Sequence, residues 1–489
     1  MNFDKSNYSN IFVLLIISLF LRISTVSGQQ SNSLYYMDRI PQSAQLNPGI
    51  QPKCGFYLGL PGFSSLEVNA GNNALGFLDV FKPNMVGDSL GYRKDVLNKL
   101  DKNILLFGDL RQDWLSFGFR VNESYFTFAI SERIETSGIL PKDLIRLTLN
   151  GNMQNFSDPA KSYNFDLSGL GLNATWYREY ALGYSKEINE NLTFGLRARL
   201  LFGKANITTT TAITLPQTDM SLWKANANLE LKSSVPTLHV TYKSDGKIDS
   251  TELKQNNSDA LLDKLNSYNP TNNKGIGLDF GIVLKPISIL TFSASILDIG
   301  YIHWKNNIHS LSYNGPVTFK GLPASVSDTI DRMQALVDTF KNLKYRHNQD
   351  DYITTLSPKL YVGAHLQLVK FLGVGFLSRF QMMESSIRSQ YTLSLNLTSA
   401  KFIGTTLSYT LADGMTDNFG IAMNLNFGPL QWYISSDRIP LYWAANKDPN
   451  SSPYIPENYK NFNIHTGINL VFGYVRNRKL IKDKPLVAL

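Results

Sequence analysis

Apolar and polar residues alternate along much of this chain. In SPKLYVGAHLQLVKFLGVGF, residues 357–376, every second residue from Leu360 to Leu368 is apolar. The same period of two recurs in WLSFGFRV (114–121) and LTFGLRARL (192–200). A period of two predicts β-strands, each with one apolar and one polar face.

The predicted strands are long, often about ten residues, which is the length that a tilted strand needs to cross a bilayer. Their polar rows are rich in Ser, Thr, Asn, Gly and Arg. Aromatic residues such as Trp176 and Trp432 lie near strand ends, where membrane barrels carry aromatic girdles at the level of the lipid headgroups. A soluble β-sandwich with one wet face is the alternative, but the strand length counts against it. Because lipid cannot satisfy an open sheet edge, the strands must close into a barrel with apolar rows facing lipid.

The connections alternate between short turns and long polar segments. The long segments cover about residues 134–168, 205–274, 302–354 and 438–461, and we place the strand-like residues 205–243 in a hairpin outside the membrane. Bacterial barrels have short turns at the periplasm and long loops outside. We therefore predict an all-β fold, a transmembrane antiparallel β-barrel of about 14 strands with long extracellular loops, over residues 54–489.

The first residues have the features of a secretory signal peptide. Lys5 precedes the apolar run IFVLLIISLFL, and Val26 and Gly28 supply the small residues of a cleavage site after residue 28. The apolar run is shorter than the roughly 20 residues of a spanning helix. We therefore expect residues 1–28 to direct export and the mature protein to lie in the outer membrane.

Residues 29–53 alternate poorly and precede the first predicted strand. The lumen of a barrel of about 14 strands is wide enough to require filling or to conduct solutes. A disordered periplasmic tail is one interpretation. We favour an N-terminal plug, because the segment has several groups that it could bury in the lumen. Its candidate contact residues are Tyr35, Tyr36, Met37 and Asp38.

Composition excludes several kinds of chemistry. The single cysteine, Cys54, excludes an internal disulfide and a thiolate metal cluster. The formal charge of +8 is modest over 489 residues, and without a basic motif it does not indicate nucleic-acid binding. No HExxH, GxSxG or phosphate-loop motif occurs. We expect no catalytic residue, metal or cofactor, and an outer-membrane enzyme is the weakest hypothesis.

The polar rows supply candidate lumen residues. Their arginines could line a path for anionic solutes, including a fatty carboxylate, or form a salt-bridge ladder that braces the plug, for example to Asp38. We favour the ladder, since such charges commonly brace a closed barrel. Two histidines could face each other as a metal or acid–base pair, or be hydrogen-bonded interior residues, which we favour. The lumen candidates are Arg120, Arg197, Arg199, Lys359, Tyr361, His365 and His465.

Two segments resemble a known family. YYMDRIPQSAQLNPGIQP (35–52) resembles the Y-x-M-x-x-x-P-Q-x-x-x-x-N-P opening of a family of outer-membrane barrels of unknown function that is abundant in Bacteroidota. YITTLSPKLYVGA (352–364) is similar to that family's central segment, with Ser357 where Leu is usual. The resemblance implies an architecture like that of the FadL-like long-chain fatty acid transporters, which have 14 strands and an N-terminal hatch.

The sequence leaves two functions open. The first is binding or passage of a hydrophobic or amphiphilic small molecule across the outer membrane. The alternative is a structural or accessory subunit of an envelope secretion or assembly complex. A lateral opening would favour the first function, and a proline in mid-strand would indicate such a break. No proline lies clearly inside a predicted spanning segment. Outer-membrane lipid is the expected surrounding partner.

Overall fold

The computed structural model describes most of the chain. The described residues are 32–76, 95–150, 164–216, 223–236, 238–242, 244, 248–253, 273–319, 338–340, 342–383, 386–398, 402–412, 415–440, 443–445, 454–456 and 460–474. The expected signal peptide, residues 1–28, lies outside these ranges. Within them, no helix is long and apolar enough to cross a membrane.

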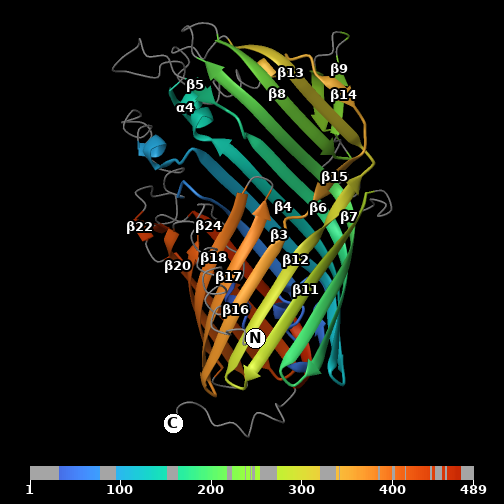
Figure 1. Ribbon diagram of the computed structural model, residues 1–489, viewed down its shortest axis with the longest axis vertical. Helices are drawn as coiled ribbons and strands as arrows, with labels where there is room; N and C mark the ends of the chain where they lie inside the picture. Colours follow the sequence, from blue (N-terminus) through green and yellow to red (C-terminus); the bar gives the residue numbers. More distant parts are fainter. Residues whose placement is uncertain are drawn as a thin grey trace, which may run out of the picture.

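Fourteen antiparallel strands close into a barrel, which confirms the predicted fold class. Each strand pairs with its neighbours in the chain, and β24 pairs with the first strand to complete the circle (Figure 1). The strands after the first are β3 (Asn103–Val121), β4 (Ser124–Pro141), β6 (Gly171–Asn189), β7 (Leu192–Pro216), β11 (Lys274–Ile287), β12 (Leu290–Trp304), β16 (Lys359–Val369), β17 (Leu372–Met383), β18 (Ser386–Leu397), β19 (Ile403–Ala412), β20 (Met415–Phe427), β21 (Leu430–Ser436) and β24 (Asn461–Tyr474).

The first barrel strand is split into β1 (Cys54–Gly59) and β2 (Ser65–Asn72). Both parts pair with β3 on one side and β24 on the other, so they occupy one position in the wall. The intervening residues leave the strand where Pro61 lacks an N–H and Gly62 has a φ of 76°. Phe63 points outward and is 70% exposed. A proline therefore does interrupt a spanning strand, and the sequence-based expectation was wrong here because the strand's first half had not been recognised.

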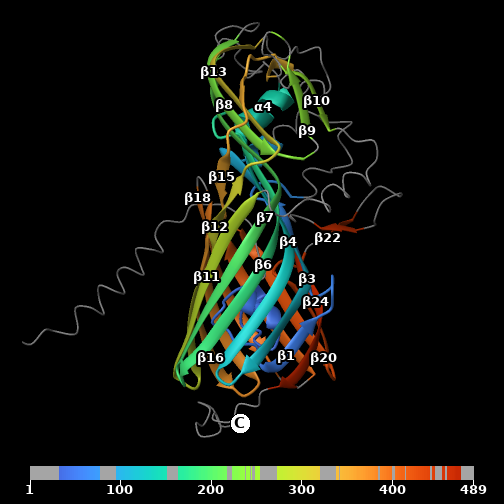
Figure 2. The same cartoon turned by 90° about the vertical axis from the view of Figure 1, so that its right-hand side faces the viewer.

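Short turns close one end of the barrel, and the opposite end carries an outer extension. Strands β4, β6 and β7 continue beyond the barrel rim, where β8 (Trp223–Ser234) pairs with β7 and with β13 (Ile308–Phe319) (Figure 2). The extension also includes helix α4 (Lys142–Asn150), β5 (Asn164–Asp166) and β14 (Arg346–Asn348). It has its own apolar core, which includes Leu147, Phe165, Leu167 and Val317. Because short turns lie at the periplasm in bacterial barrels, the extension marks the outer end.

Five further short strands lie near this outer end. β15 (Tyr352–Thr355) pairs with β12 just before β16 begins. Strands β9 (Leu238–Tyr242) and β10 (Ile248–Leu253) form one hairpin, and β22 (Trp443–Ala445) and β23 (Tyr454–Pro456) form another.

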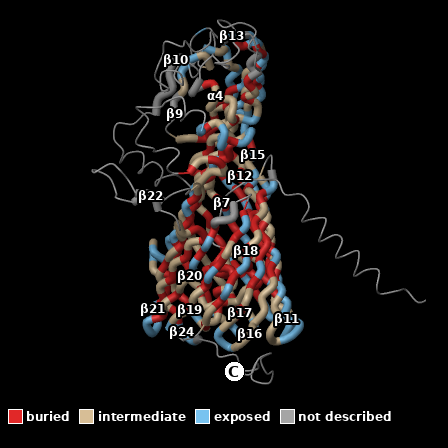
Figure 3. Tube along the Cα trace, turned by 90° about the vertical axis from the view of Figure 1, so that its left-hand side faces the viewer, coloured by how far each residue is buried: buried red, intermediate tan, exposed pale blue. Residues whose placement is uncertain are grey.

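The barrel is apolar outside and polar inside. Along β16, Tyr361 is 1% exposed, whereas Val362 is 47% exposed on the outer surface. The tube in Figure 3 shows this alternation of buried and exposed positions around the barrel. Exposed apolar side chains include Leu182, Leu200, Ile276, Leu393 and Phe419. The apolar rows therefore form the lipid-facing belt of an outer-membrane barrel.

Residues 32–53 lie inside the lower barrel, where Figure 2 shows them as a dark blue segment enclosed by the strands. They form two short 3-10 helices, η1 (Asn32–Leu34) and η2 (Pro41–Gln45), joined by turns. We call residues 32–53 the plug. Three apolar plug residues, Leu34, Met37 and Ile40, are buried against Ala422 and Tyr433 of the wall.

Candidate functional site

The plug is fixed to the wall at its first helix and its second helix. The backbone N–H groups of Asn32 and Ser33 donate to the Asp437 carboxylate at 2.5 and 2.9 Å. Gln42 donates to the Ser64 carbonyl at 3.0 Å and exchanges amide hydrogen bonds with Asn469. Ser64 ends the interruption in the first barrel strand, so the plug contacts the wall directly at that break.

The four candidate plug residues have separate contacts. The Tyr35 ring stacks on Tyr361, with 5.7 Å between ring centroids, and its hydroxyl donates to Ser293. The Tyr36 hydroxyl donates to the Phe376 carbonyl at 2.6 Å. Met37 belongs to the apolar contact with Ala422 and Tyr433 described above. Asp38 forms an ion pair with Lys53 at 2.7 Å, within the plug.

Two wall glycines allow the last part of the plug to approach the strands. A Cβ on Gly195 would lie 2.1 Å from the Pro48 carbonyl carbon. A Cβ on Gly281 would lie 2.1 Å from Asn47 Oδ1. Neither contact is sterically allowed, so strands β7 and β11 need glycine where the plug backbone crosses them.

A buried ion-pair network crosses the lumen beside the plug. Its centre is Arg199, whose side chain is fully buried and lies 2.6 Å from Asp298, 2.9 Å from Asp279 and 3.2 Å from Glu179. Lys359 also binds Asp298, at 2.5 Å. The network comprises five cations and five anions, Arg111, Arg133, Arg197, Arg199, Lys359, Asp113, Glu135, Glu179, Asp279 and Asp298.

This network is electrically balanced and is held almost entirely by the wall. Its members come from β3, β4, β6, β7, β11, β12 and β16. A single plug residue joins it: Arg197 donates to the Gln45 carbonyl at 2.9 Å, and the Gln45 amide donates to Asp113 at 2.7 Å. Buried charges require such complete pairing, because an unpaired charge in a low-dielectric interior is costly. Plug and network together occupy the middle of the lumen.

The candidate lumen residues fall into several groups. Arg197, Arg199 and Lys359 belong to the network. Arg120 lies nearer the periplasmic end, where it donates to the Pro52 carbonyl at 2.9 Å and to Gln51. None of the four cations forms an ion pair with Asp38 in the described residues, so the example of a ladder to Asp38 was wrong: Asp38 is taken by Lys53, and the arginines have acidic partners on the wall.

The remaining candidates lie against the plug or the wall. The Tyr361 hydroxyl accepts a hydrogen bond from Arg379 at 3.0 Å. The His365 ring lies 5.2 Å from the Tyr36 ring. His465 interacts with the Ser65 hydroxyl at 2.8 Å and the Tyr433 hydroxyl at 3.1 Å.

His365 is in β16 and His465 is in β24, two strands that do not pair with each other. The two histidines therefore have different partners and do not form one site. Across the described part of the chain, no group of three or more His, Cys, Asp or Glu side chains is arranged to hold a metal ion.

Sequence reasoning missed the acidic half of the network. Glu179 and Asp279 occupy inward positions of regular alternation, in YREYALGY and GIGLDFGIV, so strand parity could have found them. Asp298 could not be found in this way. It has a φ of 61° and follows the inward-facing Leu297, so the local bulge places two consecutive residues inside.

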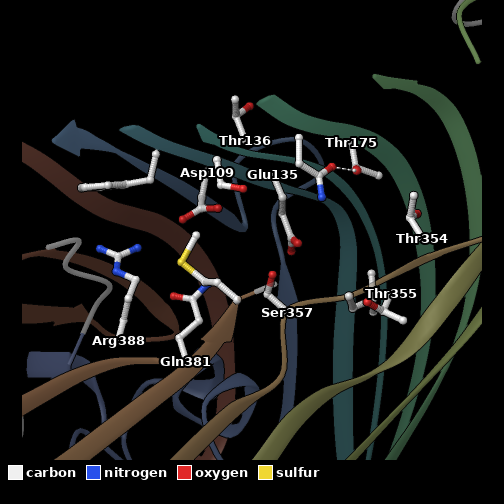
Figure 4. A pocket seen from close by; sticks show the side chains of 14 residues that line it. Asp109, Glu135, Thr136, Thr175, Thr354, Thr355, Ser357, Gln381 and Arg388 are labelled. Atoms are coloured by element: carbon white, nitrogen blue, oxygen red, sulfur yellow. Dashed lines mark hydrogen bonds between the residues drawn. The ribbon is translucent and has the colours of Figure 1, made fainter. Parts of the chain in front are cut away.

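A cavity of about 250 Å³ lies at the outer mouth, between the extended strands and the rim of β15 to β17. Its apolar lining includes Leu105, Ile139, Leu172, Leu356, Met382 and Met383. An adjoining polar pocket shares Ser137 and Asn173 with it. Figure 4 shows Asp109, Glu135, Gln381 and Arg388 around this pocket. The two spaces place an apolar surface beside a charged one.

Residues 48–437 match the sequence profile of a family of unknown function, DUF5723. The chain belongs to this family. That membership confirms the resemblance to a family of unknown function, and the matched residues include the segment 352–364 and the end of the segment 35–52. No curated protein matches the sequence.

Solved structures similar to this family member are FadL-like outer-membrane barrels. A Pseudomonas aeruginosa FadL homologue is 8% identical, with a TM-score of 0.41, over 92% of this chain and 99% of that chain. The P. putida toluene transporter TodX is 8% identical, with a TM-score of 0.35, over 88% and 90%. The monoaromatic hydrocarbon channel CymD is 8% identical, with a TM-score of 0.37, over 93% and 95%.

Proposed function

We propose that this outer-membrane barrel binds a small hydrophobic or amphiphilic molecule at its outer mouth and passes it across the outer membrane. The observation that carries the proposal is the 250 Å³ cavity with its apolar lining. Ligand sites are typically concave, mostly apolar and equipped with a few polar groups that fix orientation. At about 250 Å³ the cavity is slightly smaller than the usual ligand pocket of about 300–1,000 Å³, which suits a small molecule.

The adjoining polar pocket supports an amphiphilic rather than a purely apolar ligand. An apolar body would contact Leu105, Leu172 and Met382, while a polar head group would reach toward Arg388 and Gln381. A guanidinium binds a carboxylate through paired hydrogen bonds. A fatty or aromatic carboxylic acid therefore combines the two chemistries that this mouth offers.

The split first strand supports passage. Its interruption at residues 60–64 leaves Phe63 on the outer surface, and on the inside the plug residue Gln42 donates to the Ser64 carbonyl. Movement of the plug would therefore remove a hydrogen bond from the wall position where the first barrel strand is already broken. Since plug and network occupy the lumen, passage requires such a movement.

The proposal is tested by native mass spectrometry of the protein extracted gently from outer membranes. We expect a stoichiometric small amphiphile. Ser137→Phe should fill the cavity and reduce the bound amphiphile about tenfold, as expected when a ring occupies the space of the ligand. Thr210→Phe, on an exposed position of the outer extension, is the matched control and should retain it. An empty wild-type barrel, or equal binding by Ser137→Phe, would contradict the proposal.

A second candidate function is that of an accessory subunit in an envelope complex. The observation that favours it is the closed lumen together with an outer extension that has its own apolar core. The same mass spectra distinguish the two functions. A stable protein partner on a barrel without small molecule would support the accessory role.

A further inference from the structure

A row of charged and aromatic side chains crosses the outer surface of the barrel. Strand pairing places Arg178 opposite Glu132 on one side and Phe202 on the other. Phe202 is in turn opposite Lys274, and Lys274 is opposite His303. Residues directly opposite each other on paired strands point to the same face of the sheet. The row therefore runs over β4, β6, β7, β11 and β12 at one level.

The face in question is the lipid-facing one. Lys274 is exposed and alternates with buried Gly275, and Ile276, two residues on, is 49% exposed. The same reasoning holds for β6, where the exposed Leu182 shares the face of Arg178, whereas Glu179 points into the lumen network. These cations are thus separate from the ones inside the barrel.

The level of the row coincides with the outer edge of the apolar belt. Arg178 lies eleven residues above Asn189, the end of β6 at the periplasmic turn. At about 3.3 Å per residue and a tilt of about 40°, this corresponds to roughly 28 Å, just above a belt of about 25 Å. Aromatic rings of the kind that form interfacial girdles lie in the row or within two residues of it, with Trp176 just above, Phe202 in the row, and Tyr180 and Tyr301 just below.

One part of the row is held rigidly by a carboxylate. Glu132 accepts hydrogen bonds from Arg178 at 2.5 Å, Lys204 at 2.9 Å and the Trp176 indole at 2.8 Å. The Lys204 ammonium also lies 5.0 Å from the Trp176 ring centroid. One acid therefore orients two cations, which leaves a net positive charge.

The other part of the row adds a further cation. Lys274 lies two strands from Arg178, about 10 Å away at the usual strand spacing, on the other side of Phe202. His303 next to it is 3.4 Å from Asp351. With Asp351 counted as well, Arg178, Lys204 and Lys274 stand against two carboxylates, Glu132 and Asp351, which leaves one positive charge in excess.

We propose that this row binds the phosphate groups of an outer-leaflet lipid headgroup. Cations on the lipid face are unfavourable at the bilayer midplane but cost little near the interface, where anionic headgroups can bind them. Arg178 offers a planar guanidinium already oriented by Glu132, and Lys274 offers an ammonium on a flexible stem. Their separation across Phe202 suits a headgroup with more than one phosphate.

The test is titration of the purified barrel, in neutral detergent, with lipid A that carries two phosphates, followed by native mass spectrometry. The comparison ligand is lipid A from which the phosphates have been removed. We expect the wild-type protein to prefer the phosphorylated lipid. Each cation near a headgroup contributes about fivefold in affinity, so Arg178→Gln with Lys274→Gln should weaken binding about 25-fold. Lys274→Gln alone should weaken it about fivefold, with little risk to folding because this side chain is exposed.

A double variant at the opposite end is the control. Lys186 and Lys370 are exposed at the periplasmic end, and Lys186 is on the same face of β6 as Arg178. Lys186→Gln with Lys370→Gln removes the same charge and should leave binding unchanged. Three results would overturn the proposal: equal binding of both lipids by the wild type, unchanged binding by the Lys274→Gln variant, or an equal loss in the periplasmic control.

Discussion

The barrel interior has two halves with different chemistry. From β3 to β12, with Lys359 of β16, the inward side chains form the buried ion-pair network. From β17 to β24 the inward side chains are mainly uncharged amides and hydroxyls. They include Gln390, Thr392, Asn396, Thr410, Asn424, Gln431, Asn463 and Asn469.

The plug follows this division. Its first and second helices make most of their polar contacts with the uncharged half, through Gln390, Thr392 and Asn469 and through Asp437 just after β21. Individual neutral hydrogen bonds contribute only about 1 kcal/mol each. The ion-pair network of the charged half, in contrast, is joined to the plug through Gln45. The other polar contacts between this half and the plug are individual hydrogen bonds outside the network, such as those from Tyr35 to Ser293, from Ser295 to the Leu46 carbonyl and from Arg120 to the Pro52 carbonyl. The difference indicates that the plug can leave its contacts stepwise while the charged wall, which also supports the outer extension, stays intact.

The largest expected effect comes from breaking the centre of the charged half. Arg199→Met removes the cation that joins Asp279 to Asp298 and Glu179, and removing one partner of a buried ion pair typically costs about 3–5 kcal/mol. Thr410→Val is the counterpart in the uncharged half. It removes the 2.9 Å contact with Thr392 and should cost about 1 kcal/mol. Urea unfolding of both variants in lipid vesicles would measure the two losses. Equal losses would show that the two halves do not differ in the way proposed.

The sequence predicts the barrel better than it predicts the interior contacts. Alternation is a local property, so the strands, their faces and the number of about 14 follow from it. It also places Arg197 and Arg199 inside. Which acid each arginine meets depends on register between strands far apart in the chain: Arg199 and Asp298 are 99 positions apart. No pattern within a single strand contains that information.

Irregular backbone accounts for the remaining errors. The bulge at Asp298 breaks the period of two, and the interruption at Pro61 hides the first half of a strand. The plug contacts depend on tertiary packing in the same way. Tyr35 and Met37 are recognisable as groups to bury, but nothing in the sequence tells that one stacks on Tyr361 and the other packs on Tyr433.

A smaller effect is expected where the plug crosses the charged half. Gly195→Ala places a methyl group 2.1 Å from the Pro48 carbonyl carbon, so the plug must shift, at a cost of about 1–3 kcal/mol. Hydrogen exchange should rise in residues 45–53 while the barrel strands stay protected. Gly108→Ala is the matched control, because its nearest heavy atom would be 3.9 Å away. Unchanged exchange in Gly195→Ala would show that the plug does not pack on β7 in solution.

The smallest effect is expected for the ion pair inside the plug. Lys53 and Asp38 are as close as the partners in the network, at 2.7 Å, but their side chains are 42% and 38% exposed. Solvent screens such pairs, so Lys53→Gln should cost no more than about 0.5 kcal/mol and should matter still less at high salt. The measurement is the same urea unfolding that is used for Arg199→Met, at low and at high salt. A loss of several kcal/mol would mean that Lys53 is buried in the membrane-inserted protein. The difference in stability loss between the two halves would then depend on how far water enters the lumen, and not on which residues line each half.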